Sequence, residues 1–136
     1  MNDFKTIRFS VDNHVATLTL DNPSKRNALD PAMRVEVAQV ITHIRRDASI
    51  RALILTGANG HFCSGGDLKN IATVGLDNQG WRQRLQDLHL WLQDLLTLDR
   101  PVIAAVDGAA AGAGFSLALA ADFVLATPRA RFCMSF

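Results

Sequence analysis

The sequence predicts an α/β domain that contains parallel β-strands. Short apolar runs such as "ALILT" (52–56) and "VIAAV" (102–106) alternate along the chain with segments whose apolar residues recur at helical spacing. These runs are apolar at consecutive positions, which is typical of parallel strands buried on both faces. We therefore expect right-handed crossovers between them.

The first third of the chain predicts a hairpin, a loop and a helix. Apolar and polar residues alternate on both sides of the turn-forming pair Asp12-Asn13, which indicates a β-hairpin over residues 5–20. The segment "DNPSKRNALDP" follows as a loop. Asp30 and Pro31 are suited to the N-cap and the first turn of a helix over 31–46. The apolar residues with helical spacing in this segment are Met33, Val37, Val40, Ile41 and Ile44.

The rest of the chain alternates strands with helices. A buried strand over 51–56 leads into the glycine-rich segment "ANGHFCSGGDLKN" (58–70), in which Asp67 is suited to cap a helix. Leucines at helical spacing predict a helix over 79–97. A strand beginning at Pro101 precedes "AAAGAGFSLALAA", whose small residues predict a tightly packed helix. The segments "DFVLAT" and "RARFCMSF" predict two final strands.

Composition narrows the class of protein. The 136 residues suffice for one domain, and the net charge of +1 gives no reason to expect a nucleic-acid partner or a membrane surface. The chain has no apolar run long enough to span a bilayer and no secretory signal, so a cytoplasmic location is expected. Cys63 and Cys133 are too few and too far apart for a disulfide framework or a zinc cluster, and no metal site is predicted.

Two segments resemble each other, each following an apolar strand and leading into a helix. They are "ANGHFCSGGDLKN" and "DGAAAGAGFSLALAAD" (107–122). Helix N-termini carry unpaired backbone N–H groups, and glycine allows a ligand to approach that backbone. Two such bends from adjacent strands could direct two N–H donors at one oxygen, as an oxyanion hole does. The alternative is that the glycines serve only turns and close packing.

Other site motifs are incomplete in this chain. Gly112 and Gly114 begin a dinucleotide-type pattern, but Leu117 stands where its third glycine would be. Ser116 lacks the second glycine of a hydrolase elbow. The four histidines, at positions 14, 43, 61 and 89, have no metal-ligand spacing. Glu36, the sole glutamate, is far in sequence from both glycine segments, and we assign it no catalytic role.

Four long motifs, in this order, resemble the enoyl-CoA hydratase/isomerase family, the crotonases. They are "NPSKRNAL" (22–29), "LILTGANGHFCSGGDLK" (53–69), "RPVIAAVDGAAAGAGFSLALAADFVLAT" (100–127) and "ARFCMSF" (130–136). The resemblance covers essentially the whole chain. It implies a spiral of ββα units that assembles as a homotrimer or hexamer. It also implies an acyl-CoA substrate and no cofactor, because coenzyme A is part of the substrate. Crotonase chains are usually longer, so residues 1–136 are expected to be the N-terminal part of a crotonase-like domain whose C-terminal half is absent.

The resemblance also implies roles for individual residues. The backbone amides of Gly66 and Ala113 would hold the thioester oxygen. The residues implied to bind the substrate are Lys25, Arg26, Ala28, Ser64, Gly65, Asp67, Leu68 and Lys69. The three cations among them suit phosphates, whereas capping a helix is expected to be the main role of Asp67. The apolar residues Trp81, Leu85 and Leu88 either shape an acyl pocket or belong to the core, and we favour the core.

The residue type at position 116 indicates which reaction of the family to expect. Hydratases of the family place a glutamate where this chain has Ser116, so hydration by two glutamates is disfavoured. The closest resemblance is to isomerases such as those acting on ring epoxides in phenylacetate degradation. We therefore expect an acyl-CoA isomerase whose proton-moving carboxylate lies beyond residue 136. The alternatives are an enoyl-CoA hydratase, a non-catalytic acyl-CoA-binding subunit and, more weakly, a nucleotide-binding α/β domain.

Overall fold

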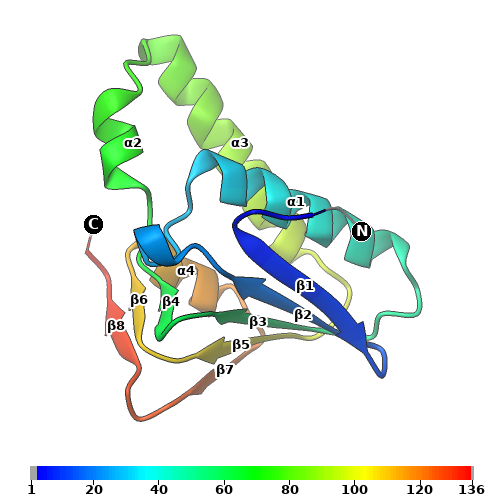
Figure 1. Cartoon of the computed structure of the whole chain (residues 1–136). Helices are drawn as coiled ribbons and strands as arrows, with labels where there is room; N and C mark the ends of the chain where they lie inside the picture. Colours follow the sequence, from blue (N-terminus) through cyan, green and yellow to red (C-terminus); the bar gives the residue numbers. More distant parts are fainter. Residues whose placement is uncertain (1–2, 136) are drawn as a thin grey trace.

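Two β-sheets organise the chain in the computed structural model, which describes residues 3–135 (Figure 1). The larger sheet has the strand order β1 (Ile7–Asp12), β2 (Val15–Leu20), β3 (Ala52–Gly57), β5 (Val102–Val106) and β7 (Phe123–Ala126). The smaller sheet has the order β4 (His61–Cys63), β6 (Ala109–Ala111) and β8 (Arg131–Cys133). All pairings are parallel except that of β1 with β2. The predicted α/β class is confirmed.

The helices lie between and beside these strands. They are the short 3-10 helix η1 (Pro23–Lys25), and the α-helices α1 (Pro31–Arg46), α2 (Leu68–Thr73), α3 (Asn78–Leu96) and α4 (Ala113–Leu119). Helices α1 and α3 pack against each other over one side of the larger sheet, and α4 contacts β4, β5 and β6 (Figure 1). No helix in residues 3–135 is both long and apolar enough to cross a membrane.

Local chemistry explains the N-terminal elements. The hairpin turn places Asn13 and His14 at positive φ, 47° and 68°, the backbone conformation that a two-residue hairpin turn requires. Asp30 caps α1 by accepting a hydrogen bond of 2.8 Å from the Met33 N–H. Pro31 follows at a position that needs no N–H partner. The bounds of α1 are those predicted, and its five apolar residues at helical spacing are buried.

The predicted spiral of ββα units is confirmed in the order of the elements. Strand β3 joins the larger sheet, β4 joins the smaller one, and helices α2 and α3 follow. Strand β5, strand β6 and helix α4 repeat this arrangement, and β7 and β8 begin it a third time. The last predicted strand extends to Phe136, which lies outside the described residues.

Two short strands were not predicted from the sequence. Residues 61–63 lie within the glycine-rich segment and residues 109–111 within the predicted small-residue helix, whereas they form β4 and β6. Segments of three residues are too short to show a period. The alanines of β6 have no preference for strand, but they pair with β4 on one side and β8 on the other. The tertiary pairing therefore overrides their local propensity.

Glycines allow the bends between the two sheets to stack on one another. A Cβ atom on Gly108 would lie 1.9 Å from the carbonyl oxygen of Gly60, and one on Gly57 would lie 2.1 Å from that of His61. Gly108 also has a φ of +77°. Both contacts are backbone against backbone. The contact at Gly57 lies within the bend from β3 to β4, whereas the one at Gly108 leaves no room for a side chain between successive units.

Replacing Gly108 tests whether this stacking limits stability. We expect Gly108→Ala to lower the free energy of unfolding by about 3 kcal/mol more than Gly75→Ala, measured by urea denaturation. Gly75 is a matched control, since its φ is +64° but no atom lies within 4 Å of an added Cβ. Equal losses of unfolding free energy in the two variants would show that the positive φ, and not the close contact, makes glycine necessary for stability.

Candidate functional site

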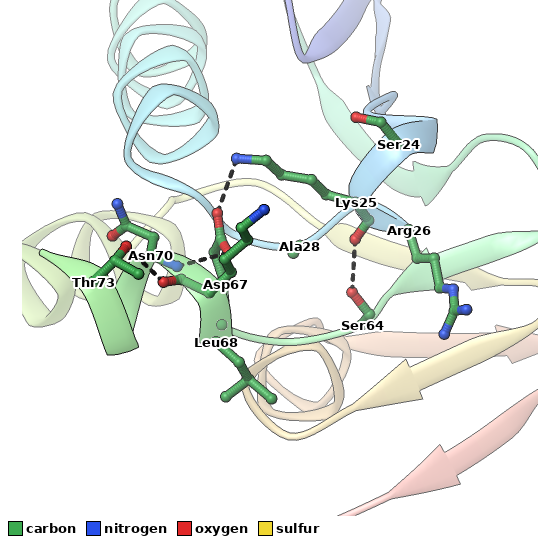
Figure 2. Close-up of a pocket in the computed structure, with 11 residues that line it drawn as sticks. Ser24, Lys25, Arg26, Ala28, Ser64, Asp67, Leu68, Asn70 and Thr73 are labelled. Atoms are coloured by element: carbon green, nitrogen blue, oxygen red, sulfur yellow. Dashed lines mark hydrogen bonds and ion pairs between the residues drawn. The ribbon is translucent and has the colours of Figure 1, made fainter.

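The first glycine segment is held by the loop that precedes α1. The Leu29 N–H donates to the Gly65 carbonyl at 2.7 Å, and the Ser64 N–H donates to the Arg26 carbonyl at 3.2 Å. The Ser64 hydroxyl donates to the Lys25 carbonyl at 3.0 Å (Figure 2). Segments nearly forty residues apart are thus joined mainly through backbone groups. The position of the glycine segment depends on this loop.

Asn27 is a fully buried polar residue that the sequence analysis did not single out. Its side-chain oxygen accepts from the Asn22 N–H at 2.8 Å. Its amide nitrogen donates to the carbonyls of Ala58 and His61 at 3.0 and 2.9 Å. Buried polar groups require such partners. Its place between Arg26 and Ala28 in the polar loop "NPSKRNAL" gave no sign that this amide would be buried.

A lysine joins the caps of two helices. The Lys25 ammonium lies 2.9 Å from a carboxylate oxygen of Asp67 and 2.9 Å from one of Asp30 (the pair with Asp67 is drawn in Figure 2). The hydrogen bonds that the ammonium donates to Asp67 and next to Asp30 raise the pKa of Lys25. The Lys25 ammonium, and next the Asn70 N–H, lower the pKa of Asp67. The expected capping role of Asp67 is confirmed, because its carboxylate accepts from the Asn70 N–H at 3.1 Å.

The residues implied to bind the substrate surround one depression, which we call the loop groove. Its volume is about 790 Å³. Every residue implied to bind the substrate lines it except Gly65, and Gly66 lines it as well. The loop groove is lined by Ser24, Lys25, Arg26, Ala28, Ser64, Gly66, Asp67, Leu68, Lys69, Asn70 and Thr73, most of which Figure 2 labels. The phosphate-binding role of its three cations stays a prediction.

Gly66 also lines a second, smaller space, which we call the amide cavity. Its volume is about 120 Å³, and Ala113 lies in its wall. The other lining residues are Leu29, Arg34, Ile71, Trp81, Arg84, Leu85 and Leu88. The loop groove and the amide cavity therefore share Gly66.

The favoured interpretation of three α3 residues as core is confirmed only for Leu88, which is partly buried and packs against the core. Trp81, Leu85 and Leu88 all line the amide cavity, and Leu85 is 52% exposed. The part of α3 that is buried lies further along the helix, at Trp91 and Leu95. Helical periodicity identifies an apolar face but does not say whether that face meets a sheet or a cavity.

The two glycine bends contact each other without intervening side chains. A Cβ on Gly114 would lie 2.2 Å from the Cys63 carbonyl oxygen. One on Gly65, whose φ is +105°, would lie 2.9 Å from the Ala111 carbonyl oxygen and 3.7 Å from the Ala113 nitrogen. This approach brings Ala113 to the same cavity as Gly66.

The amides of Gly66 and Ala113 are available in the described part of the chain. The hydrogen bonds there outside helices and strands include none donated by either N–H. Two donors without internal partners that line one small cavity can stabilise an anionic oxygen.

Other reactive side chains have structural roles. The Glu36 carboxylate accepts from the N–H groups of Lys5 and Thr6 at 2.8 and 2.9 Å, joining the N-terminal segment to α1. Asp122 accepts from the Val102 N–H at 2.8 Å, as a structural residue would. Burial raises the pKa of the Cys63 thiol to about 11, so it is neutral near pH 7. Within residues 3–135 there is no cluster of three metal-ligating side chains.

Comparison with known proteins identifies the family of the chain. The model of the enoyl-CoA hydratase/isomerase family matches residues 10–136. The chain is 43% identical over 134 residues to a probable enoyl-CoA hydratase of Rhodobacter capsulatus, covering 98% of the chain and 50% of that protein. It is 38% identical over 128 residues to the 1,2-epoxyphenylacetyl-CoA isomerase of Escherichia coli K12, covering 93% of the chain and 49% of that enzyme.

A solved structure supports the same assignment. An enoyl-CoA hydratase/isomerase from Cupriavidus metallidurans CH34 is 41% identical and superposes with a TM-score of 0.88, covering 97% of the chain and 49% of the solved chain. The chain belongs to the enoyl-CoA hydratase/isomerase family, and the resemblance to crotonases is confirmed. It spans about half the length of these relatives.

The shared ion pair predicts how acid affects the fold. The pKa of Asp67 is lowered in the folded state, so its contribution to stability is complete above the ordinary carboxyl pKa of 3.8 and is lost as pH falls through the lowered value. In Lys25→Met the pKa of Asp67 rises toward its ordinary value, so acid unfolding followed by circular dichroism should begin at higher pH. Lys69→Met, an exposed cation of the same groove, is the control. An unchanged acid midpoint in Lys25→Met would contradict this role.

Proposed function

We propose that the protein carrying this chain is an acyl-CoA isomerase that shifts a carbon–carbon double bond through a thioester enolate. The CoA portion would lie along the loop groove, where Lys25, Arg26 and Lys69 provide positive charge. The thioester carbonyl would accept hydrogen bonds from the N–H groups of Gly66 and Ala113. Family membership supports an acyl-CoA substrate.

One observation carries the proposal. Gly66 lines both the loop groove and the amide cavity, and Ala113 lines the amide cavity from the second glycine bend. A thioester at this junction would have CoA on one side and its acyl group on the other. The apolar side chains of Leu29, Ile71 and Leu88 suit an acyl chain.

The two amides would supply the shared chemical step. Removing a proton from the carbon next to a thioester places negative charge on the carbonyl oxygen. Fixed N–H donors stabilise that charge more than they stabilise the neutral carbonyl, and each is worth about 3 kcal/mol in a site with little water. The direct backbone contact at Gly65 and Gly114 would fix both donors before the substrate binds.

A single carboxylate would move the proton. It would remove a proton from C2 of a 3-enoyl thioester, the dienolate would carry its charge on the thioester oxygen, and the proton would return at C4 to leave a 2-enoyl thioester. Among the described residues, the side chains that line the amide cavity include no carboxylate, and Ser116 has no acidic group. We propose that the carboxylate comes from outside residues 3–135.

Two alternatives have specific support. The name of the Rhodobacter capsulatus relative favours hydration, in which water adds to the double bond. The absence of a lining carboxylate among residues 3–135 suits a non-catalytic acyl-CoA-binding subunit. As the setting for the activity we propose a homotrimer or hexamer in the cytoplasm.

Two substrates distinguish these functions. We expect the protein to convert (3E)-hexenoyl-CoA to the (2E) isomer. We also expect that it does not add water to (2E)-hexenoyl-CoA. Chromatography with mass spectrometry would identify the products of both incubations. Formation of 3-hydroxyhexanoyl-CoA from the (2E) substrate would establish hydration instead. Binding of both thioesters by calorimetry without conversion of either would establish a binding subunit.

Removing one N–H tests the amide pair. Ala113→Pro deletes a donor at the first position of α4, where proline is tolerated, and should lower kcat about 100- to 1,000-fold. Ala113→Gly retains the N–H and should keep kcat near that of the unaltered protein. Thermal unfolding of both variants controls for folding. Equal kcat in the two variants, with both folded, would remove Ala113 from the mechanism.

A further inference from the structure

The charged side chains that line the amide cavity are both guanidinium groups. Arg34 of α1 and Arg84 of α3 share its wall with the apolar residues, and no carboxylate among the described residues lines it. The same two arginines also line a third depression, the helix groove, which lies between α1 and α3 and has a volume of about 600 Å³. The amide cavity and the helix groove therefore share two positively charged lining residues.

Arg84 is held in place by its neighbours. Its guanidinium donates to the Asn70 side-chain oxygen at 2.8 Å and lies 5.4 Å from the centre of the Trp81 ring. A cation in contact with an aromatic face is stabilised by the ring quadrupole. Arg84 thus forms a fixed cationic wall of the cavity.

Arg34 lacks comparable partners. Its Nε is buried and makes no hydrogen bond, and its guanidinium forms no ion pair within residues 3–135. Burial, and next the charge of Arg84, lower its pKa. The Nε1 of Trp91, which also lines the helix groove, is a second buried donor without a partner in the described residues. Unsatisfied donors of this kind call for an acceptor.

The nearby carboxylates are already engaged. Asp30 pairs with Lys25 at 2.9 Å and caps α1. Asp87 accepts from Gln83 at 2.8 Å and lines the helix groove but not the amide cavity. Neither neutralises Arg34 by direct contact.

The size of the amide cavity limits what reaches Arg34. A volume of about 120 Å³ corresponds to roughly four water-sized groups. An acyl chain whose carbonyl lies at Gly66 and Ala113 would therefore reach Arg34 after a few carbon atoms. A longer chain would have to pass between the two arginines into the helix groove.

We propose that the acyl group of the natural substrate is short and ends in a carboxylate that the Arg34 guanidinium binds. Arg84 adds a second positive charge beside it. The inference rests on the proposed function, since it assigns the far end of the same acyl site. Arg34 is then a specificity-determining residue that does not contact the reacting atoms.

Two thioesters of the same shape test the inference. Glutaryl-CoA ends in a carboxylate, and 5-methylhexanoyl-CoA replaces that group with two methyls on one carbon. By calorimetry at matched ionic strength, glutaryl-CoA should bind about tenfold more tightly to the unaltered protein. Arg34→Met should remove this preference, and Arg34→Lys should keep part of it. Arg46→Met, an exposed cation at the other end of α1, should leave the preference intact.

Each outcome bears on a different proposal. Equal affinity of the two thioesters for the unaltered protein, or an unchanged preference in a folded Arg34→Met variant, would overturn the inference and leave acyl-CoA binding in place. Failure of the unaltered protein to bind either thioester would overturn the proposed function, and with it the inference. Loss of the preference in Arg46→Met as well would show that overall charge, and not Arg34, attracts the carboxylate.

Discussion

The architecture depends on direct backbone contact between the bends that leave neighbouring strands. Gly114 lies against the Cys63 carbonyl, and Gly65 lies against that of Ala111, at separations that no Cβ atom could occupy. Because these contacts involve backbone atoms, the positions of the Gly66 and Ala113 nitrogens follow from chain geometry and not from side-chain rotamers. In the proposed site, such preorganised donors would require no reorganisation when charge develops.

The loop before α1 reinforces this arrangement through two polar networks, one buried around Asn27 and one around the partly exposed Lys25. The Asn27 side chain forms hydrogen bonds with the backbone of the loop itself and with the backbone between the end of β3 and the start of β4. Lys25 forms ion pairs with the carboxylates that cap α1 and α2. The ion pairs of Lys25 affect the electrostatics of the loop groove. Because Asp30 and Asp67 balance much of the Lys25 charge, an anionic ligand in the groove would be attracted mainly by Arg26 and Lys69.

The amide cavity combines polar groups with apolar side chains. Gly66 is shared with the loop groove, whereas Arg34 and Arg84 are shared with the helix groove. The leucines and the isoleucine of the lining are apolar. A cavity with this pattern favours ligands that carry acceptors at a matching spacing, because an unpaired buried polar group is costly.

The sequence by itself determined the elements whose causes are local. The helix over 31–46, its Asp30 cap and the hairpin could be recognised, since periodicity, capping and turn chemistry act within a few residues. The family was recognised from the resemblance of four motifs. Tertiary structure decided the rest. It turned residues 61–63 and 109–111 into strands, placed Trp81 at a cavity instead of in the core, and brought Arg34 beside Arg84. These outcomes arise from contacts between segments far apart in the chain, whose geometry no local pattern encodes.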